Sequence, residues 1–281
     1  MQLGAIFLDN AVVNIEFPAA DQEVLPGVQW GSIDAFPSPA YWAYQVYARR
    51  IIGTKINYKL GSTLKEEVGA CLLGGHGIPA NVGVAAFKKM KALGVFGEVP
   101  PHEDTLHVWL SEPLQIAGKD VRYRFAKQKA KYLAAALDKL QNDAPPSDSG
   151  KSLRDWLLAI PGIGYKTASW AVRNWLDADD VAILDIHILR AGLIGGFFDT
   201  KLTVERDYLV LEQQFISFSQ ALGVRASELD ALIWLEMMSS PKSVHGILES
   251  LTLSPTERKK SFVPRRTKQR HTDANQTTLL I

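Results

Sequence analysis

A short Gly-rich turn between two helical patterns is the feature that most constrains how this chain folds. The turn reads Ile160-Pro161-Gly162-Ile163-Gly164-Tyr165-Lys166. Pro161 stops the preceding helix, expected over residues 153–160, because proline lacks a backbone N–H and restricts the residue before it. Apolar residues then recur at helical spacing from Ala168 to Leu176, which predicts a second helix. We therefore expect a helical hairpin over residues 153–176.

The turn and the helix start that follows it suit a phosphate. Gly162 and Gly164 permit positive φ and a close approach of the backbone to a ligand. The first N–H groups of a helix lack partners within it, so such a terminus binds phosphate without side-chain charge. Lys166 lies in this first turn, where a positive charge opposes the helix dipole. A chemical role for Lys166 is therefore favoured over a solvated lysine at a helix start.

A second short segment, Leu184-Asp185-Ile186-His187, follows the hairpin. Asp185 can cap a helix that starts at Ile186, and capping would also fix the orientation of its carboxylate. A lysine must be neutral to act as a nucleophile, and a helix start in a partly desolvated cleft disfavours its ammonium form. A carboxylate beside it can assist proton transfer. Lys166 and Asp185 are therefore candidate catalytic residues.

Together, the hairpin, its lysine and the Asp-X-His segment resemble the helix-hairpin-helix DNA glycosylases, the superfamily of endonuclease III, the adenine glycosylases and 8-oxoguanine DNA glycosylase. Polymerases, ligases and repair nucleases use the bare hairpin to hold DNA, so the lysine and the aspartate make the resemblance specific. It is strongest over residues 153–192 and weaker over 39–240. It implies a mainly α, two-lobed helix-hairpin-helix glycosylase fold. The expected parts are a short N-terminal β or irregular extension (1–35), the glycosylase domain (36–254) and a basic, disordered tail (255–281).

The resemblance also implies an enzyme. Lys166 would attack C1′ of a flipped nucleotide and displace the base, and Asp185 would stabilise the positive charge that develops on the sugar. The resulting Schiff base permits elimination, which nicks the strand. Lys166 therefore implies a bifunctional glycosylase and AP lyase, whereas relatives without the lysine activate water. Gly162, Gly164 and His187 would contact the DNA backbone.

The number of cysteines narrows the choice among the branches of this superfamily. Cys71 is the only cysteine, which excludes a disulfide framework and the four-cysteine iron–sulfur cluster of endonuclease III and the adenine glycosylases. The histidines show no metal-ligand spacing with Cys71, so we expect neither a cofactor nor a metal. The cluster-free branches include 8-oxoguanine DNA glycosylase, so excision of 8-oxoguanine in base excision repair is the expected function. Two alternatives stay open: a glycosylase for another modified base, such as a hypermodified base in foreign DNA, and a non-catalytic DNA-binding module.

Three residues are candidates for a base pocket. Trp170 lies one helical turn after Lys166 and could stack on the extruded base or pack in the core. Asp230 and Trp234 are one turn apart on a predicted C-terminal helix, where the 8-oxoguanine branch carries a polar reader and an aromatic. A carboxylate can accept from guanine N1–H and N2–H₂ together, although Asp230 could instead pair with Ser227 in a capping box.

Two segments are candidates for contact with the opposite strand. The loop Gly74-Gly75-His76-Gly77-Ile78-Pro79-Ala80-Asn81 precedes a predicted helix. The resemblance implies that Asn81, or else His76, fills the hole left by the flipped base, and Asn81 as a helix N-cap is the alternative. A basic run could face the opposite base or form a solvated helix face; it consists of Arg122, Arg124, Lys127, Lys129 and Lys131.

Charge and hydropathy bear on partners and location. The net charge is +1, but the chain from Ser254 onward holds seven of the 31 basic and two of the 30 acidic residues. This tail could scan DNA electrostatically, improve solubility or, in a eukaryote, direct the protein to the nucleus. No apolar run suits a membrane span or a signal peptide. We expect a monomeric protein that is intracellular and DNA-associated, located in the cytoplasm or nucleoid, or in the nucleus of a eukaryote. Its expected partner is double-stranded DNA that contains a damaged or modified base. We do not expect it to bind a membrane.

Overall fold

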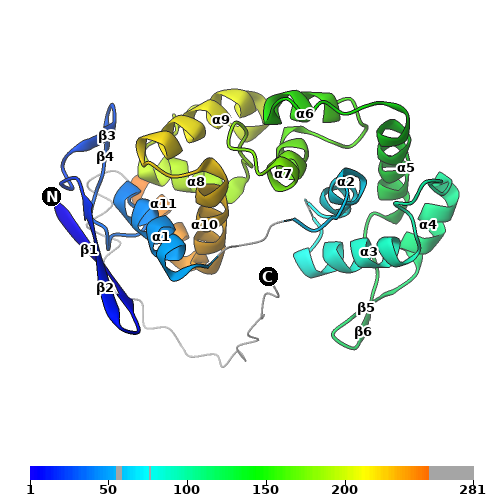
Figure 1. The fold of residues 1–281 in the computed structure, drawn as a ribbon, viewed down its shortest axis with the longest axis horizontal. Coiled ribbons are helices and arrows are strands. Elements are labelled where there is room, and N and C mark those ends of the chain that lie inside the picture. The colour runs from blue at the N-terminus through cyan, green and yellow to red at the C-terminus, as the bar shows by residue number, and fades with distance from the viewer. Residues whose placement is uncertain (55–58, 76, 253–281) are drawn as a thin grey trace. The chain divides into compact units, whose positions relative to one another are not determined.

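A computed structural model describes residues 1–54, 59–75 and 77–252, and the chain divides into two compact units (Figure 1). The first unit comprises Met1–Tyr58, Ile186–Thr200 and Leu232–Ile281, and the second comprises Lys59–Asp185 and Lys201–Ala231. Helices dominate and the strands form only short pairs, which confirms the predicted mainly α class. Within the described residues, no helix has both the length and the apolar character that a membrane crossing requires.

The first unit begins with a β-hairpin, inside the N-terminal extension (1–35) that was expected to be β or irregular. β1 (Gln2–Leu8) pairs antiparallel with β2 (Ala11–Phe17), in a register that runs from Gln2 opposite Phe17 to Leu8 opposite Ala11. Ile6 and Phe17 are buried while Leu3 and Phe7 are exposed, because successive side chains point to opposite faces of a strand. β3 (Glu23–Leu25) and β4 (Val28–Gln29) form a second, smaller pair.

The helices of the first unit are α1 (Pro39–Ile52), α8 (Ile186–Gly195), α11 (Pro241–Thr252) and the end of α10 (Ala226–Ser239). α1 starts where the sequence offers a cap: the Ser38 side chain accepts from the backbone N–H of Tyr41 at 3.0 Å, and proline occupies the first helical position. Glu236 of α10 ties that helix to α1 by an ion pair with Arg49 at 3.3 Å.

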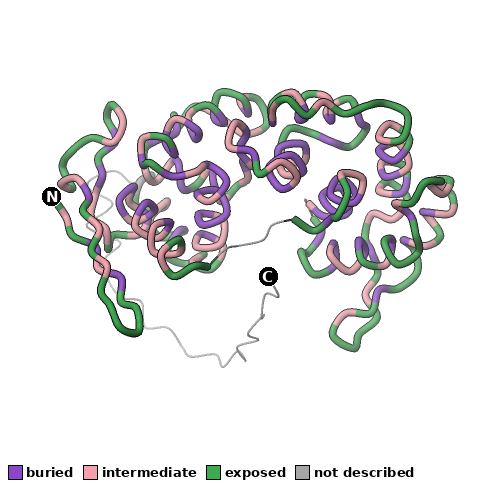
Figure 2. Tube along the Cα trace, viewed as in Figure 1, coloured by how far each residue is buried: buried purple, intermediate pink, exposed green. Residues whose placement is uncertain are grey.

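The second unit holds the hairpin. Its elements are α2 (Leu64–Leu73), α3 (Ala80–Ala92), α4 (Glu103–Ser111), β5 (Leu114–Ile116), β6 (Lys119–Val121), α5 (Ala126–Asn142), α6 (Gly150–Leu157), α7 (Tyr165–Leu176), α9 (Val204–Ala221) and the start of α10. One apolar cluster joins α2 to α3, α4 and α5, around Met90, Leu106 and Leu133. Another joins α2 and α5 to α6 and α7, around Leu72 and Leu153. The buried turns of α2, α5 and α7 are purple in Figure 2. Packing on these clusters fixes α7, the helix that carries Lys166.

Several short elements were not predicted from the sequence. α4, the β5–β6 pair and α11 all lie outside the predicted helices and strands. β5 and β6 span only three residues each, which is too short for alternation to be recognised. The hairpin helices predicted within residues 153–176 extend over Gly150–Leu157 (α6) and Tyr165–Leu176 (α7).

Candidate active site

The predicted helical hairpin is formed by α6, the Gly-rich turn and α7, but α6 ends before the expected residue, Ile160. α6 ends at Leu157, and the chain then turns through N–H···O bonds from Ala159 to Trp156 and from Ile160 to Leu157. Ile160 and Ile163 are buried and anchor the turn on the core. Gly162 and Gly164 are exposed between these anchors. The turn thus presents its backbone outward while its apolar side chains hold it in place.

The start of α7 has the properties of an anion site. Gly164 occupies the N-cap position, and within the part of the chain that the structure describes no side chain makes a capping hydrogen bond there. The N–H groups of the first turn therefore lack a side-chain partner at the cap. Apart from Gly164 itself and its neighbours along the chain, no heavy atom of the described residues lies within 4 Å of a Cβ built on Gly164. A phosphate can approach the backbone there, at the positive end of the helix dipole.

Lys166 and Asp185 lie next to each other in the second unit. The Lys166 Nζ is 3.9 Å from a carboxylate oxygen of Asp185. The Lys166 side chain is 44% exposed and the Asp185 side chain 9% exposed. Lys166 therefore reaches solvent, and an incoming substrate, from the second residue of α7, while Asp185 is held by the protein around it.

Asp185 also occupies the position expected for it at a helix start. α8 begins at Ile186, so Asp185 is the residue at the N-cap position. A primary amine beside a carboxylate can act as a nucleophile at an electrophilic carbon, and the carboxylate can take up the proton that the amine gives away. The pair is thus equipped for imine chemistry or for general acid–base work.

Trp170 lies on the Lys166 face of α7 and contacts the Gly-rich loop. It is half-buried and packs on the second apolar cluster. Its ring lies 3.3 Å from a Cβ built on Gly74, so a side chain at that position would meet the tryptophan ring closely. The core-packing alternative accounts for these contacts, and base stacking by Trp170 stays a prediction.

The structure brings together the two segments predicted to contact the opposite strand. A Cβ built on Gly77 would lie 3.3 Å from the ring of Phe125, so the Gly-rich loop runs beside the segment of Arg122 and Arg124. Both arginines and Asn81 are exposed. The alternative that Asn81 caps its helix is wrong, because α3 begins at Ala80 with Pro79 at the N-cap. His76 lies outside the described residues.

One member of the basic run is not available to DNA. Lys129 points inward and donates to the carbonyl oxygens of Leu72 at 2.6 Å and Gly74 at 3.2 Å. Burial lowers the pKa of Lys129. Tyr123 donates to the carbonyl between them, that of Leu73, at 2.7 Å. Lys129 and Tyr123 thus cap the C-terminus of α2, where backbone carbonyls lack helical partners, and they fix the start of the Gly-rich loop.

No sequence motif marks Lys129 as a capping residue, although its position on α5 is a signal of that role. Lys129 is four residues before Leu133, which is buried in the first apolar cluster, so both lie on the inward face of α5. A lysine on the apolar face of a helix needs several acceptors, and the carbonyls of a helix C-terminus supply them.

Asp230 is buried beside an arginine. Its carboxylate lies 3.5 Å from a guanidinium nitrogen of Arg173, and the two side chains are 2% and 7% exposed. Burial raises the pKa of Asp230 to about 6, although the charge of Arg173 opposes the rise. The base-reading role of Asp230 stays a prediction, beside a second interpretation in which the residue neutralises a buried arginine of α7.

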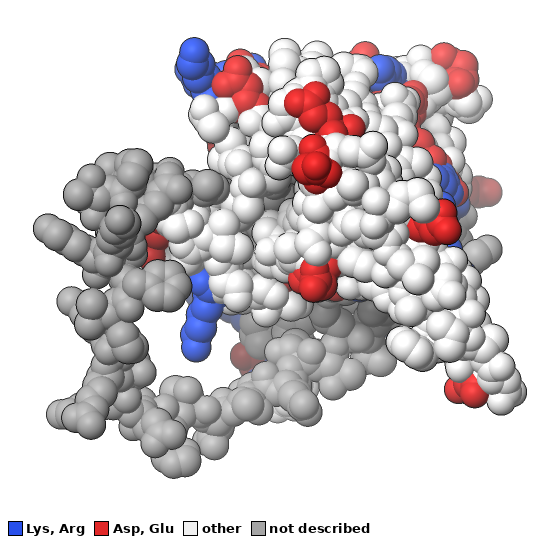
Figure 3. Space-filling view, turned by 90° about the vertical axis from the view of Figure 1, so that its left-hand side faces the viewer, with Lys and Arg blue, Asp and Glu red and all other residues white. Residues whose placement is uncertain are grey.

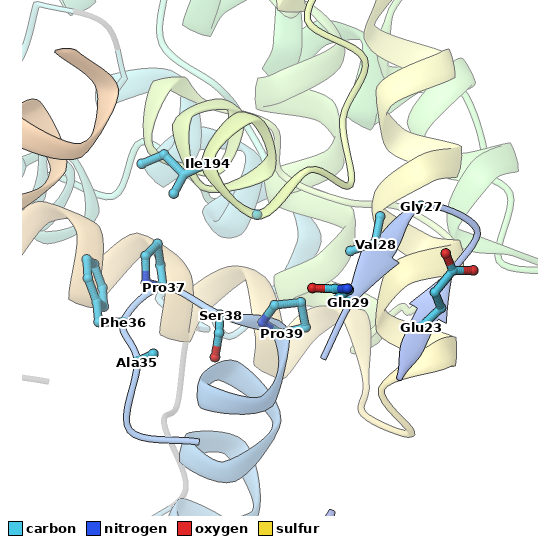
Figure 4. A pocket seen from close by; sticks show the side chains of 11 residues that line it. Glu23, Gly27, Val28, Gln29, Ala35, Phe36, Pro37, Ser38, Pro39 and Ile194 are labelled. Carbon is cyan, nitrogen blue, oxygen red and sulfur yellow. The ribbon is translucent and has the colours of Figure 1, made fainter. Parts of the chain in front are cut away.

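His187 and Trp234 belong to the first unit, on α8 and on the end of α10. Both are partly buried. The first unit also has a pocket of about 450 Å³ next to β4, the Ala35–Pro39 loop and Ile194 (Figure 4). None of the candidate site residues lines this pocket, so it does not belong to the predicted chemistry.

Comparison with known proteins assigns the chain to a family. The family model described as 8-oxoguanine DNA glycosylase, the Ogg helix-hairpin-helix domain, matches residues 61–224, more than half of the 281-residue chain. The chain belongs to this 8-oxoguanine DNA glycosylase family. The matched range includes the hairpin, Lys166 and Asp185, whereas Asp230 and Trp234 fall outside it.

Individual members of the family match parts of the chain. The 8-oxoguanine DNA glycosylase/AP lyase of Methanocaldococcus jannaschii is 34% identical over 128 residues, 44% of this chain and 61% of that protein. The protein of the same name from Saccharolobus islandicus is 32% identical over 161 residues, 54% of this chain and 72% of that protein. The match thus spans less than two thirds of the first relative. The crystal structure of the M. jannaschii 8-oxoguanine DNA glycosylase matches with a TM-score of 0.53 and 26% identity, over 70% of this chain and 91% of that one.

Proposed function

We propose that this protein is a bifunctional DNA glycosylase and AP lyase that removes 8-oxoguanine from double-stranded DNA. The observation that carries the proposal is the 3.9 Å approach of the Lys166 amine to the Asp185 carboxylate, at the start of a helix that follows a Pro-Gly hairpin. The names of the M. jannaschii and S. islandicus relatives support the reaction and the substrate. An intracellular, DNA-associated location and a monomeric state belong to the same proposal.

The first chemical step exchanges one bond for another at the sugar. The neutral amine of Lys166 attacks C1′ of the extruded nucleotide, and the base leaves with the electron pair of the N-glycosidic bond and acquires a proton. Asp185 stabilises the positive charge that develops on the sugar and shuttles the amine proton. The deoxyribose ring then opens to give an imine between Lys166 and C1′.

The second step breaks the strand. Loss of a proton from C2′ of the imine expels the 3′ phosphate with its electron pair, and hydrolysis of the imine returns free Lys166 and the processed sugar. This elimination requires an amine and not a water molecule as nucleophile. The proposal therefore makes Lys166 necessary for both base excision and strand cleavage.

In this proposal, DNA is held by backbone and side-chain groups of several segments. Backbone N–H groups at Gly162, Gly164 and the start of α7 bind phosphate, with His187 as a further backbone contact. The exposed residues Asn81, Arg122 and Arg124 face the opposite strand and the space vacated by the base. Trp170, Asp230 and Trp234 remain the candidates for contact with the base itself.

Borohydride trapping on a duplex that carries 8-oxoguanine opposite cytosine tests the proposal. The wild type is expected to give a covalent protein–DNA adduct, because borohydride reduces the imine to a stable amine. Lys166→Gln is expected to give none, since it has no nucleophile, and Asp185→Asn is expected to excise the base at least about 100-fold more slowly. Lys151→Gln, on α6, is the matched control and should trap like the wild type.

The outcomes separate the alternatives. Trapping on an abasic duplex but not on the 8-oxoguanine duplex would keep the lysine mechanism and reject the substrate, and a panel of other modified bases would then identify it. Base release without an adduct would mean that water is the nucleophile. If the protein neither released the base nor formed an adduct, and Lys166→Gln still bound DNA, the protein would be a non-catalytic DNA-binding module.

A further inference from the structure

The backbone that leads to Asp185 is held by a tyrosine on α9. The Tyr208 hydroxyl donates to the carbonyl oxygen of Ala182 at 2.7 Å and accepts from the N–H of Leu184 at 3.2 Å. Ala182 and Leu184 are buried, and Leu184 directly precedes Asp185. Burial raises the pKa of Tyr208, so the hydroxyl keeps the proton that it needs to donate.

Glu212, one turn after Tyr208 on α9, also binds the backbone segment that precedes Asp185. The Glu212 carboxylate accepts from the N–H of Ala182 at 3.1 Å and forms a buried ion pair with Arg154 of α6. Ser169 of α7 donates to the same carboxylate at 3.4 Å. Backbone groups before Asp185 are thus joined to the helix that carries Lys166 by side chains of one turn of α9.

Tyr208 also contacts Tyr165, the residue that precedes Lys166. Its ring stacks on that of Tyr165, with centroids 5.3 Å apart and planes 18° apart. Tyr165 is the first residue of α7 and precedes Lys166. The same side chain therefore contacts the neighbours of both Lys166 and Asp185, through its ring on one side and its hydroxyl on the other.

We propose that Tyr208 is a positioning residue, which sets the distance between the Asp185 carboxylate and the Lys166 amine. The inference rests on the proposed function of that pair. The lysine side chain is long and 44% exposed, so the better-defined partner is Asp185, and its place depends on the backbone that Tyr208 holds. A displacement of about 1 Å in such a pair can cost about 100-fold in rate.

Tyr208→Phe is the informative variant, because it keeps the stacked ring and removes the hydrogen bonds of the hydroxyl to Ala182 and Leu184. Excision of 8-oxoguanine in a single turnover should slow by about tenfold, the effect expected when one or two hydrogen bonds are removed. Trapping on a preformed abasic site should fall much less, since no base has to be expelled from an open-chain aldehyde. Tyr44→Phe removes a comparable hydroxyl, which donates to the Ala5 carbonyl at 2.7 Å in the first unit, and should react like the wild type.

A double-mutant cycle with Asp185→Asn distinguishes positioning from a general loss of structure. If Tyr208 acts through Asp185, adding Tyr208→Phe to Asp185→Asn should slow excision by less than about twofold. Rates are measured below the melting temperature of each variant, so that a loss of stability does not mimic a loss of rate.

Two results would overturn the positioning role while leaving the enzyme intact: wild-type excision by Tyr208→Phe, or losses that multiply in the double variant. A wild type that traps neither the 8-oxoguanine duplex nor the abasic duplex would reject the proposed function, and the positioning role with it.

Discussion

At the scale of the residue, the two hairpin glycines have different roles. Gly162 has φ of 84°, and a Cβ at this position would lie 2.2 Å from the ring of Tyr132. Gly164 has φ of −101°, which any residue adopts, and a Cβ there would meet open space. The sequence suggested the same conformational freedom for both glycines, but only Gly162 uses it. Gly164 is instead placed to let a ligand approach.

Alanine substitutions should therefore separate folding from DNA binding. Gly162→Ala should lower stability by about 1–3 kcal/mol, because it combines a strained φ with a steric clash. Gly164→Ala should leave the melting temperature nearly unchanged and weaken binding to an abasic duplex by about tenfold, as its methyl group hinders a charge-assisted N–H···phosphate bond. Thermal melts and fluorescence anisotropy check the two effects. Unchanged binding by Gly164→Ala would contradict phosphate recognition at the start of α7.

At the scale of the element, α2 shows how a capped helix makes stability depend on pH. The Thr63 side chain accepts from the N–H of Glu66 at 3.2 Å, and the Glu66 carboxylate accepts from the N–H of Ser62 at 2.6 Å. Lys91 of α3 donates to the same carboxylate at 2.8 Å. Burial acts to raise the pKa of Glu66, but these hydrogen bonds outweigh it and lower the pKa from 4.5 to about 2.

Glu66→Gln should consequently destabilise the protein only when the carboxylate is charged. The depressed pKa means that the folded state holds the charged form more tightly than the unfolded state does. The contribution, about 1 kcal/mol after allowance for solvent screening, should be present above pH 4.5 and disappear as the pH falls toward about 2. Thermal melts of wild type and variant between neutral and acid pH measure it. Glu103→Gln, in the first turn of α4, is the control, and a difference that stayed constant with pH would contradict the assignment.

At the scale of the whole molecule, charge is unevenly distributed along the chain. Residues 1–48 contain no lysine or arginine and five acidic residues: Asp9, Glu16, Asp21, Glu23 and Asp34. The side of the molecule drawn in Figure 3 is mostly uncharged, with acidic side chains and a few lysine or arginine side chains scattered over it. The N-terminal strands therefore supply no cations for DNA, and attraction to phosphate has to come from the basic residues further along the chain.

Removal of residues 254–281 should weaken DNA binding without changing the chemistry. The seven basic residues of this tail can each neutralise a phosphate. Truncation should therefore make the plot of log K against log salt shallower, by about 0.9 for each phosphate that the tail no longer neutralises. Single-turnover excision at saturating protein should stay at the wild-type rate. A full-length variant with glutamine at the seven positions separates charge from length. An unchanged salt dependence would leave the tail with a role in solubility.

The sequence alone determined the features that depend on neighbours along the chain. A proline, two glycines and helical periodicity define the hairpin, and Asp185 falls at a helix start because α8 begins directly after it. Turn chemistry and periodicity act over a few residues, so they can be read without coordinates. The short strands β5 and β6 escaped prediction because three residues give no recognisable period.

Which polar side chains serve the fold and which face a ligand depends on how distant segments pack, and this could not be read from the sequence. Lys129 belongs to a basic run in the sequence, yet it caps a helix 55 to 57 residues away. Tyr208 belongs to no motif recognised in the sequence, yet its hydroxyl forms hydrogen bonds to the backbone of Ala182 and Leu184, in the segment before Asp185. Asp230 fits the spacing of a base reader, yet it lies buried against Arg173. Such roles depend on which helices pack together, because a buried polar group takes whatever partner the packing brings within hydrogen-bonding distance.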